Sequence, residues 1–431
     1  MFWMAAIASS TMPREISADQ LAALLKPGMR IFVQGSVGQP IALLRAIADA
    51  ESGIEGIHFV SPLTPGLNGF DIGGEGQGNR LTTFFDYPAL RRSWTSGTVD
   101  FVPSHYSRIS DWLKATEPVD IALIQLAPPD AGGLCSLGLS ADFIPDLLPY
   151  CDCVVAQINR AMPDLLGAPK ISLDALDYSI FVAEDLPVQP VPEADAISEA
   201  IAGHVASIVN DGDTIQFGVG RLPQLAVAGL HHKADLGLHS GLVTPVVRPL
   251  IESGVLSGKR KQVDSGLHVT GAVSGDADFY DWIAERTDFA IRPVSCTHAQ
   301  AILSRIRNLV AINSAIAVDL FGQANAEMTG SRQISGSGGL VDFVRGANSA
   351  PGGRSIICLP ATSRDGTRSN IVFRLNSVVT ICRTDIDIVI TEYGVARLRL
   401  LPPAARAQAL IAISAPAFRQ SLAEEWKRNA I

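Results

Sequence analysis

Two kinds of segment alternate along the chain, and they differ in how their apolar residues are spaced. Short apolar runs rich in β-branched residues are typical of strands buried on both faces, whereas the longer segments between them repeat apolar residues every three or four positions, as amphipathic helices do. Strands that alternate with helices in this way predict an α/β fold with largely parallel sheets. The expected strands are residues 31–33, 57–60, 119–125, 153–158, 214–217, 309–312, 355–359 and 386–390.

One pattern of turn, buried strand, glycine loop and helix occurs twice. The first copy runs through residues 27–32 to a loop at 35–40, and the second runs through residues 211–217 to a loop at 218–223. Each loop ends in proline and leads into a helical pattern. Such a repeat predicts two similar, open α/β domains in tandem.

An acidic, proline-containing stretch at residues 184–193 has the composition of a linker. A chain of 431 residues is also long enough for two or three separate cores. We therefore expect a first α/β domain over residues 1–195 and a second over residues 196–431.

The composition is that of a globular protein, with 47% hydrophobic and 18% charged residues. The formal net charge is -9, and lysines and arginines are scattered singly apart from a short run at 259–261. Because a negative surface repels a phosphate backbone, nucleic acid is not an expected partner.

No stretch reaches the roughly 18 to 20 apolar residues that are needed to span a bilayer. Residues 1–4 also lack the basic region of a secretory signal, so we expect a cytoplasmic protein without membrane association. The six cysteines include no Cys-x-x-Cys pair of the kind found in structural zinc sites. Cys151 and Cys153 would share one face of a strand, which favours burial, and no metal is expected.

The second glycine loop, residues 218–223, follows an expected strand and precedes a helix. Its backbone amides and the helix N-terminus can therefore meet an anion or a carbonyl oxygen, and Gly218 and Gly220 allow close approach because they have no Cβ. A tight turn without a ligand would give the same pattern. Dinucleotide-binding loops would need glycine where this chain has Pro223, so a nicotinamide cofactor is not expected.

Two further segments could contact a ligand. The glycine cluster at 336–339 suits the approach of backbone to a bound molecule, although a flexible surface loop would have a similar composition. Residues 358–367 contain Arg364 among hydroxyl side chains, which could offer a cation to a phosphate at the end of a strand.

Taken together, these segments and others resemble one enzyme family. Two of the more specific motifs are Gly-Gln-Ala-Asn-Ala-Glu at 322–327 and Thr-Glu-Tyr-Gly-Val-Ala at 391–396. From about residue 21 to residue 418 the chain resembles the acetyl-CoA hydrolase/CoA-transferase family, which includes 4-hydroxybutyrate CoA-transferases and has the class I CoA-transferase fold. The other matching segments are residues 101–103, 122–125, 128–130, 135–138, 311–315, 318–320, 330–333, 336–339 and 342–347.

The resemblance implies an enzyme that handles acyl-CoA. In the family a glutamate attacks the thioester and carries CoA covalently to a second carboxylic acid, while backbone amides stabilise the oxyanion. Coenzyme A, as acyl-CoA, and a small carboxylic acid are the implied partners, and a homo-oligomer, a dimer, is expected. The residues that match the family's CoA-binding positions are Gly218, Val219, Gly220, Arg221, Leu222, Gly338, Gly339 and Arg364.

The chain departs from the family at the nucleophile. The family's glutamate follows a histidine by two residues, and here His239 is followed by Ser240 and Gly241. With no side chain at position 241, transfer through a covalent glutamate cannot run through this residue. Residues 244–247 and Leu340 also differ from the family pattern around the expected reaction centre.

Several activities stay open from the sequence. Hydrolysis would need a general base, for which Glu327 is the weak candidate and Asp264 and Glu252 are further acids, although each is more simply explained as structural. A dyad of Ser240 and His239 is geometrically poor, because adjacent strand residues point to opposite faces. A CoA-dependent lyase, and a protein that only binds CoA thioesters, would have the same glycine loops.

Overall fold

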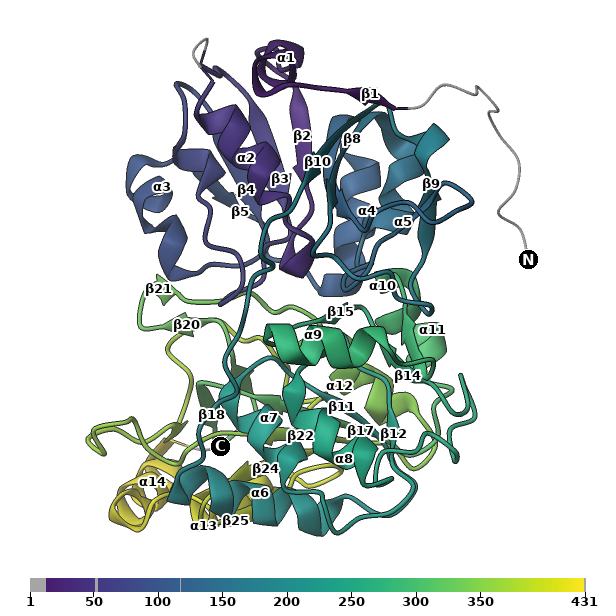
Figure 1. The fold of residues 1–431 in the computed structure, drawn as a ribbon. Helices are drawn as coiled ribbons and strands as arrows, with labels where there is room; N and C mark the ends of the chain where they lie inside the picture. Colours follow the sequence, from purple (N-terminus) through teal and green to yellow (C-terminus); the bar gives the residue numbers. More distant parts are fainter. Residues whose placement is uncertain (1–12, 51–52, 117, 430–431) are drawn as a thin grey trace.

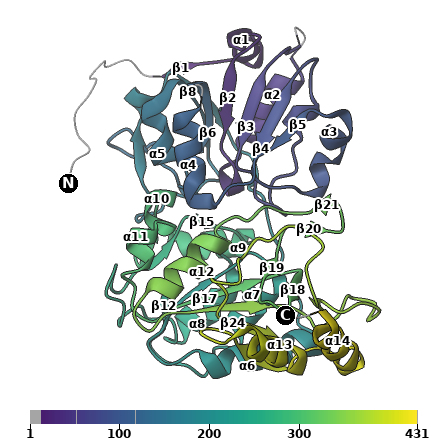
Figure 2. The same cartoon turned by 180° about the vertical axis from the view of Figure 1, so that it is seen from behind.

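The computed structural model describes residues 13–50, 53–116 and 118–429. The N-terminal residues 1–4, on which the expectation about a secretory signal rests, lie outside them. Figure 1 shows two stacked α/β units, the first from purple to blue and the second from teal to yellow, and Figure 2 shows the same arrangement from behind. The prediction of two tandem α/β domains with largely parallel sheets is confirmed.

In the first unit, eight strands among the described residues form one sheet in which every pair is parallel. In sheet order they are β1 (Arg14–Glu15), β10 (Tyr178–Val182), β8 (Cys151–Asn159), β6 (Val119–Leu126), β2 (Arg30–Val33), β3 (His58–Ser61), β4 (Arg80–Thr83) and β5 (Val99–Phe101). The helices of this unit are α1 (Ala18–Leu24), η1 (Ser36–Gly38), α2 (Ile41–Ala48), η2 (Ile72–Gly74), η3 (Pro88–Leu90), α3 (Arg91–Ser96), α4 (Tyr106–Ala115), α5 (Ile144–Leu147), η4 (Leu148–Tyr150) and η5 (Leu173–Ala175).

The second unit has a six-stranded sheet that is parallel except for its last pair. In sheet order its strands are β12 (Gly237–Leu238), β11 (Thr214–Phe217), β17 (Leu309–Ser314), β22 (Arg354–Cys358), β24 (Ile388–Thr391) and β25 (Gly394–Arg397). Its helices are α6 (Ala196–Ile208), α7 (Arg221–Ala228), η6 (Pro245–Val247), α8 (Arg248–Glu252), α9 (Ala277–Ala284), α10 (Val294–Thr297), α11 (Gln300–Leu303), α12 (Leu340–Ser349), α13 (Pro403–Ala412) and α14 (Pro416–Asn429).

Small sheets complete the fold. The pairs and one triplet are β7 (Leu134–Ser136) with β9 (Lys170–Ser172), β13 (Leu242–Val243) with β15 (Ala272–Val273), β14 (His268–Thr270) with β16 (Phe289–Ile291), β20 (Met328–Thr329) with β21 (Arg332–Gln333), and β18 (Ala317–Asp319) between β19 (Ala324–Asn325) and β23 (Ile371–Val372).

All eight strands expected from the apolar runs are present, with ends that differ by at most two residues. Strand β4 and the edge strand β5 were not expected. Their sequences, Arg-Leu-Thr-Thr and Val-Asp-Phe, are short and partly polar, so they give no apolar run.

The two sheets are joined by residues 183–195, which form no helix or strand. The segment ends in a capping box, in which the Asp195 carboxylate accepts from the backbone nitrogen of Ser198 at 2.8 Å and starts α6. Donation from Ser198 and from Arg221 lowers the pKa of Asp195 to about 2. The domain limits of 1–195 and 196–431 stay a prediction that is consistent with this connection.

One apolar core runs from the first unit into the second. It includes Ile124 and Leu147 from the first and Ile215, Val243 and Val294 from the second, all nearly inaccessible to solvent. Burial of this kind favours one fixed arrangement of the two units over independent motion. No helix within the described ranges combines the length and apolar character needed to cross a membrane.

Candidate functional site

A cavity of about 260 Å³ lies where the two units meet. Its wall includes Ser36 and Tyr106 from the first unit and Gly218, Gly241 and Gly339 from the second. Glycine loops that the sequence singled out separately are therefore brought together in one place.

Strand order explains why the cavity forms here. Apart from the short edge strand β1, the chain in each sheet first adds strands on one side of a central strand and then returns to its other side. The change of direction lies between β2 and β6 in the first unit and between β11 and β17 in the second. Loops that leave such a switch point diverge and open a crevice at the carboxyl ends of the strands. Ser36 follows β2, Gly218 follows β11, and Ser314 ends β17, so both crevices face the same cavity.

A larger residue at either glycine of the loop after β11 would displace a neighbouring side chain. An ideal Cβ on Gly218 would lie 2.8 Å from the Asn313 Oδ1 atom, and one on Gly220 would lie 2.9 Å from the Ser314 Oγ atom. Gly220 is also the N-cap residue of α7, so the free amides of the first turn of that helix are beside the cavity. Backbone approach to a ligand is therefore possible along this loop.

The glycine cluster at 336–339 is packed on the first unit, which argues against a flexible surface loop. The backbone nitrogen of Tyr106 donates to the Gly338 carbonyl at 2.9 Å, and the Ser337 hydroxyl donates to the Ser104 carbonyl at 2.8 Å. One turn later, Asp342 accepts from the nitrogen and the hydroxyl of Ser107 at 3.0 and 2.7 Å.

Gly241 borders the imidazole of His298. An ideal Cβ at position 241 would lie 2.7 Å from the His298 Cε1 atom and 2.8 Å from its Nε2 atom. A Cβ on Gly339 would lie 2.5 Å from the same Nε2 atom. The imidazole therefore occupies the space into which a side chain at position 241 would extend.

The ring of His298 is tightly held. The rings of Tyr106 and Phe343 pack against it, with both centroids 4.8 Å away, and its Nδ1 atom is 2.8 Å from the Thr297 hydroxyl. Burial lowers the pKa of His298 to about 3, with a smaller contribution from His239. The imidazole is therefore neutral at physiological pH.

Asp142 is the acidic residue among the described residues of the cavity wall. It is 6% exposed, and the Ser140 hydroxyl donates to its Oδ2 atom at 3.0 Å. Burial raises the pKa of Asp142 to about 6, although donation from Ser140 and Tyr106 offsets part of the effect. A carboxyl with this pKa can exchange a proton near neutral pH.

Two residues of the cavity wall, Ser36 and Asp142, have left-handed backbones, with φ of 57° and 32°. For residues other than glycine this conformation is unfavourable and usually needs support from the surroundings. The Asn68 amide provides it for Ser36 by accepting from its nitrogen and donating to its carbonyl, at 2.9 and 2.8 Å. Strain of this kind is common at functional sites.

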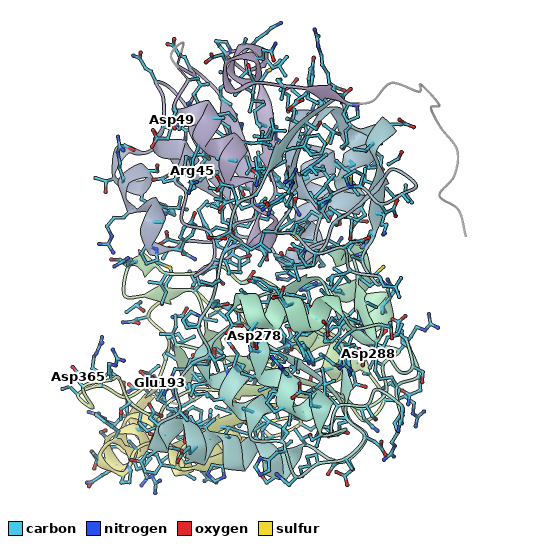
Figure 3. The ribbon with its side chains drawn as sticks, viewed as in Figure 1. Arg45, Asp49, Glu193, Asp278, Asp288 and Asp365 are labelled. Carbon is cyan, nitrogen blue, oxygen red and sulfur yellow. The ribbon has the colours of Figure 1, made fainter. Side chains whose placement is uncertain are left out.

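Several predicted site residues lie outside the cavity wall. Arg221 forms an ion pair with Asp195 at 2.7 Å and donates to the carbonyl of Glu193, while Leu222 packs on the core. Arg364 is exposed on the projecting loop whose neighbour Asp365 is labelled in Figure 3, together with Glu193.

The three acids proposed as a general base for hydrolysis also lie outside the cavity wall. Glu327 accepts from the Thr380 hydroxyl at 2.8 Å, Glu252 pairs with Arg248 at 2.9 Å, and Asp264 lies in the loop after α8. None of these three is among the described residues that line the cavity.

His239 and Ser240 do not form a dyad. The His239 imidazole donates to the Thr297 carbonyl at 3.2 Å, and the Ser240 hydroxyl donates to the Phe217 carbonyl at 3.2 Å. Both side chains are buried, and burial lowers the pKa of His239 to about 3. They hold the strand ends around the cavity in place.

Sequence reasoning missed Tyr106, Asp142 and His298. None belongs to a glycine loop or to one of the family motifs, and they are far apart along the chain. A search for polar residues just after the expected strands would not have found them either, because all three enter the cavity from connecting segments and short helices.

Two family domains match the sequence in tandem. The Acetyl-CoA hydrolase/transferase N-terminal domain matches residues 10–192, and the C-terminal domain of that family matches residues 275–426. The chain belongs to the acetyl-CoA hydrolase/transferase family. The predicted family is thereby confirmed, and with it an enzyme of the acyl-CoA-handling kind.

Relatives of this family match over most of the chain. The 4-hydroxybutyrate coenzyme A transferase of Clostridium kluyveri is 32% identical, over 96% of this chain and 97% of the relative. The acetyl-CoA hydrolase of Schizosaccharomyces pombe is 24% identical, over 75% of this chain and 70% of the relative. Among solved structures, RipA from Yersinia pestis is 28% identical with a TM-score of 0.89, over 96% and 97% of the two chains.

Replacing Gly220 by valine should weaken CoA binding by about tenfold or more, because the branched side chain would occupy the approach along the loop. Calorimetry with CoA measures the dissociation constant. Gly203→Val is the matched control, since a Cβ on Gly203, on the exposed face of α6, meets nothing within 4 Å. Equal affinity of both variants for CoA would remove the loop from the binding site.

Replacing Gly336 by alanine should lower the free energy of unfolding by about 1–3 kcal/mol, because the added Cβ would collide with the Phe84 carbonyl. Urea denaturation followed by circular dichroism measures the loss. The exposed Gly69 has nothing within 4 Å of its Cβ position, so Gly69→Ala should leave the unfolding midpoint unchanged.

Proposed function

We propose that this protein hydrolyses short acyl-CoA thioesters in the cavity between its two units, with water in place of the covalent glutamate. The observation that carries the proposal is that the carboxyl group at the reaction centre comes from a different position than in the family. Position 241 has no side chain, and the carboxyl group of the cavity is that of Asp142, whose pKa of about 6 suits a general base.

In the proposed step, the Asp142 carboxylate takes a proton from water as the water oxygen attacks the thioester carbon. The carbonyl oxygen becomes an oxyanion, which backbone amides of the glycine loops stabilise. When the intermediate collapses, the C–S bond breaks and the proton passes from Asp142 to the sulfur. The products are a carboxylic acid and free CoA, and no covalent enzyme intermediate forms.

CoA would enter along Gly218, Val219 and Gly220, with Gly338 and Gly339 opposite. A cavity of about 260 Å³ holds the acyl group and the adjoining end of the pantetheine chain, so the nucleotide would lie outside it. Arg221, Leu222 and Arg364, which are outside the wall, would then contact the outer parts of CoA.

The cavity wall favours an uncharged acyl group. No lysine or arginine occurs among the described residues that form the wall, while Asp142 supplies negative charge. A carboxylate at the far end of the acyl chain would be repelled there and would find no cation. Phe85, Leu242 and Ala272 offer apolar surface for a short alkyl chain instead.

Transfer of CoA to a small carboxylic acid is the second candidate, because the Clostridium kluyveri relative is named as a CoA transferase. In this version the acceptor carboxylate attacks the thioester carbon in place of water, and the C–S bond breaks to give a mixed anhydride and CoA thiolate. The thiolate then attacks the acceptor's carbonyl carbon in the anhydride, which forms the new thioester and releases the donor as a carboxylate. Assays with and without acetate as acceptor separate the two candidates, since transfer yields acetyl-CoA and hydrolysis yields free CoA.

We further propose that the protein acts in the cytoplasm as a homodimer. The six cysteines are all free, which suits a reducing compartment. Light scattering after size-exclusion chromatography tests the dimer, and fractionation of the source cells tests the compartment.

Replacing Asp142 by asparagine should lower kcat for acyl-CoA hydrolysis by about a hundredfold or more, because the proton acceptor is lost. In the parent, kcat should fall about tenfold per pH unit below pH 6, since the carboxylate form of Asp142 is lost as the pH drops through its raised pKa. The variant should lack this decline. Stopped assays of free thiol across pH 4 to 8 measure both effects.

Glu327→Gln is the comparison variant for this test. Its carboxylate accepts from Thr380 outside the cavity wall, so the substitution should retain hydrolysis to within about twofold. If Glu327→Gln abolished hydrolysis and Asp142→Asn did not, the base would be Glu327 and the assignment to Asp142 would be wrong.

Gly241→Glu alone should give no covalent enzyme-CoA adduct, because His298 occupies the space that the new side chain needs. The double variant Gly241→Glu, His298→Gly should form one. Incubation with acetyl-CoA, trapping with borohydride or hydroxylamine, and mass spectrometry of the peptides detects the adduct. A modified glutamate in the parent protein would show that the nucleophile has moved elsewhere.

A further inference from the structure

His298 is a buried residue of the cavity wall to which the proposed hydrolysis step assigns no role. Its Nε2 atom lies at the point where the glycines at positions 241 and 339 approach each other, and both glycines line the cavity. Within the described part of the chain, Nε2 makes no hydrogen bond. Because buried polar atoms are usually hydrogen-bonded, we expect an atom of the bound ligand to be the partner of Nε2.

The hydrogen bonds available to the Thr297 hydroxyl indicate which ring nitrogen of His298 carries the proton. The Pro293 carbonyl already accepts from the backbone nitrogens of Cys296 and Thr297, at 2.9 and 3.1 Å, while the Thr297 hydroxyl is 3.4 Å from it. The same hydroxyl is only 2.8 Å from Nδ1 of His298. Its proton is therefore best placed on the short bond to Nδ1, which leaves Nε2 protonated and a donor toward the cavity.

The orientation of the ring is fixed from several sides. Tyr106 and Phe343 pack on it, and the helix α10 that precedes it starts with a bond from the Val294 nitrogen to the Asp142 carbonyl at 2.8 Å. This backbone hydrogen bond joins the two units and thereby positions both Asp142 and His298. A donor that is held in this way loses little entropy when it meets its acceptor.

We propose that His298 is a catalytic residue that donates a hydrogen bond from Nε2 to the carbonyl oxygen of the bound thioester and to the oxyanion that forms from it. This role rests on the proposed hydrolysis of acyl-CoA. The bond strengthens as negative charge develops on the oxygen, and no proton is transferred. The low pKa keeps the ring neutral, so it cannot compete with Asp142 for the proton of water.

The kinetic test compares His298→Gln with His298→Ala. Loss of one oxyanion donor typically lowers kcat by about 10²–10³, so His298→Ala should show a loss of that size with little change in KM. His298→Gln keeps an N–H donor on a side chain of similar reach and should recover part of the loss. Equal kcat in His298→Ala and the parent would overturn the proposal.

A spectroscopic test does not depend on turnover. The probe is a ¹³C-labelled ketone analogue of acetyl-CoA in which a methylene group replaces the sulfur. When it binds to the parent protein, its carbonyl stretch should move to lower frequency, and this displacement should be smaller in His298→Ala but preserved in Asp142→Asn. An equal displacement in the parent and in His298→Ala would show that another donor contacts the carbonyl.

Thr297→Val provides a variant with the imidazole intact. Without the hydroxyl at Nδ1, the preference for the Nε2-protonated form is lost, so kcat and the carbonyl displacement should both decrease. Nitrogen NMR of ¹⁵N-histidine protein, assigned with His298→Gln, reports the tautomer directly. Protonation of Nδ1 in the parent would refute the donor role.

The outcomes separate this inference from the proposed function. A displaced carbonyl stretch that needs His298, in a parent protein without hydrolysis, would retain the donor and reject the hydrolase. Hydrolysis that needs Asp142 but not His298 would retain the hydrolase and reject the donor.

Discussion

The contact between the N-terminus of α4 and the segment that starts α12 closes the cavity, and the site depends on it. Asp342 accepts two hydrogen bonds from Ser107, and the Gly338 carbonyl accepts one from Tyr106. Burial raises the pKa of Asp342, so taking its charge out of water has a cost that these donors offset. Because Tyr106 and the glycine cluster both line the cavity, this contact also sets the distance between its two walls.

The two copies of the sequence repeat occupy equivalent places in the two sheets. Each copy supplies a central strand and the loop at its carboxyl end, and the loops at 35–40 and 218–223 both reach the cavity. Two crevices at switch points, facing each other, enclose a ligand more completely than either would alone. The repeat predicted the two domains, and with the switch-point rule it could also have predicted that their loops meet.

The features of the fold and site that could be predicted are those whose sequence signal lies within a few neighbouring residues. Strands and glycine loops leave patterns within a few residues, and the absence of a side chain at position 241 is visible in the sequence itself. The side chain that fills the adjoining space, that of His298, could not be predicted from the sequence, because it reaches Gly241 only through tertiary folding. The same holds for Asp142, whose raised pKa is a property of its burial between the two units and not of its neighbours in sequence.

Burial acts on the two ionisable groups of the cavity in opposite directions, and this explains why glycine and histidine suit each other here. Removing water raises the pKa of Asp142 and lowers that of His298, because in each case the charged form is disfavoured. The Gly241 carbonyl and the Asp142 Oδ1 atom each lie 3.0 Å from one point, the Cβ position of Gly271, so they are close neighbours. A carboxylate on residue 241 would place a second negative charge in the same water-poor space, and each would raise the pKa of the other. A neutral imidazole in that space leaves Asp142 as the single carboxyl among the described residues of the cavity wall, with a pKa that still allows it to ionise near neutral pH.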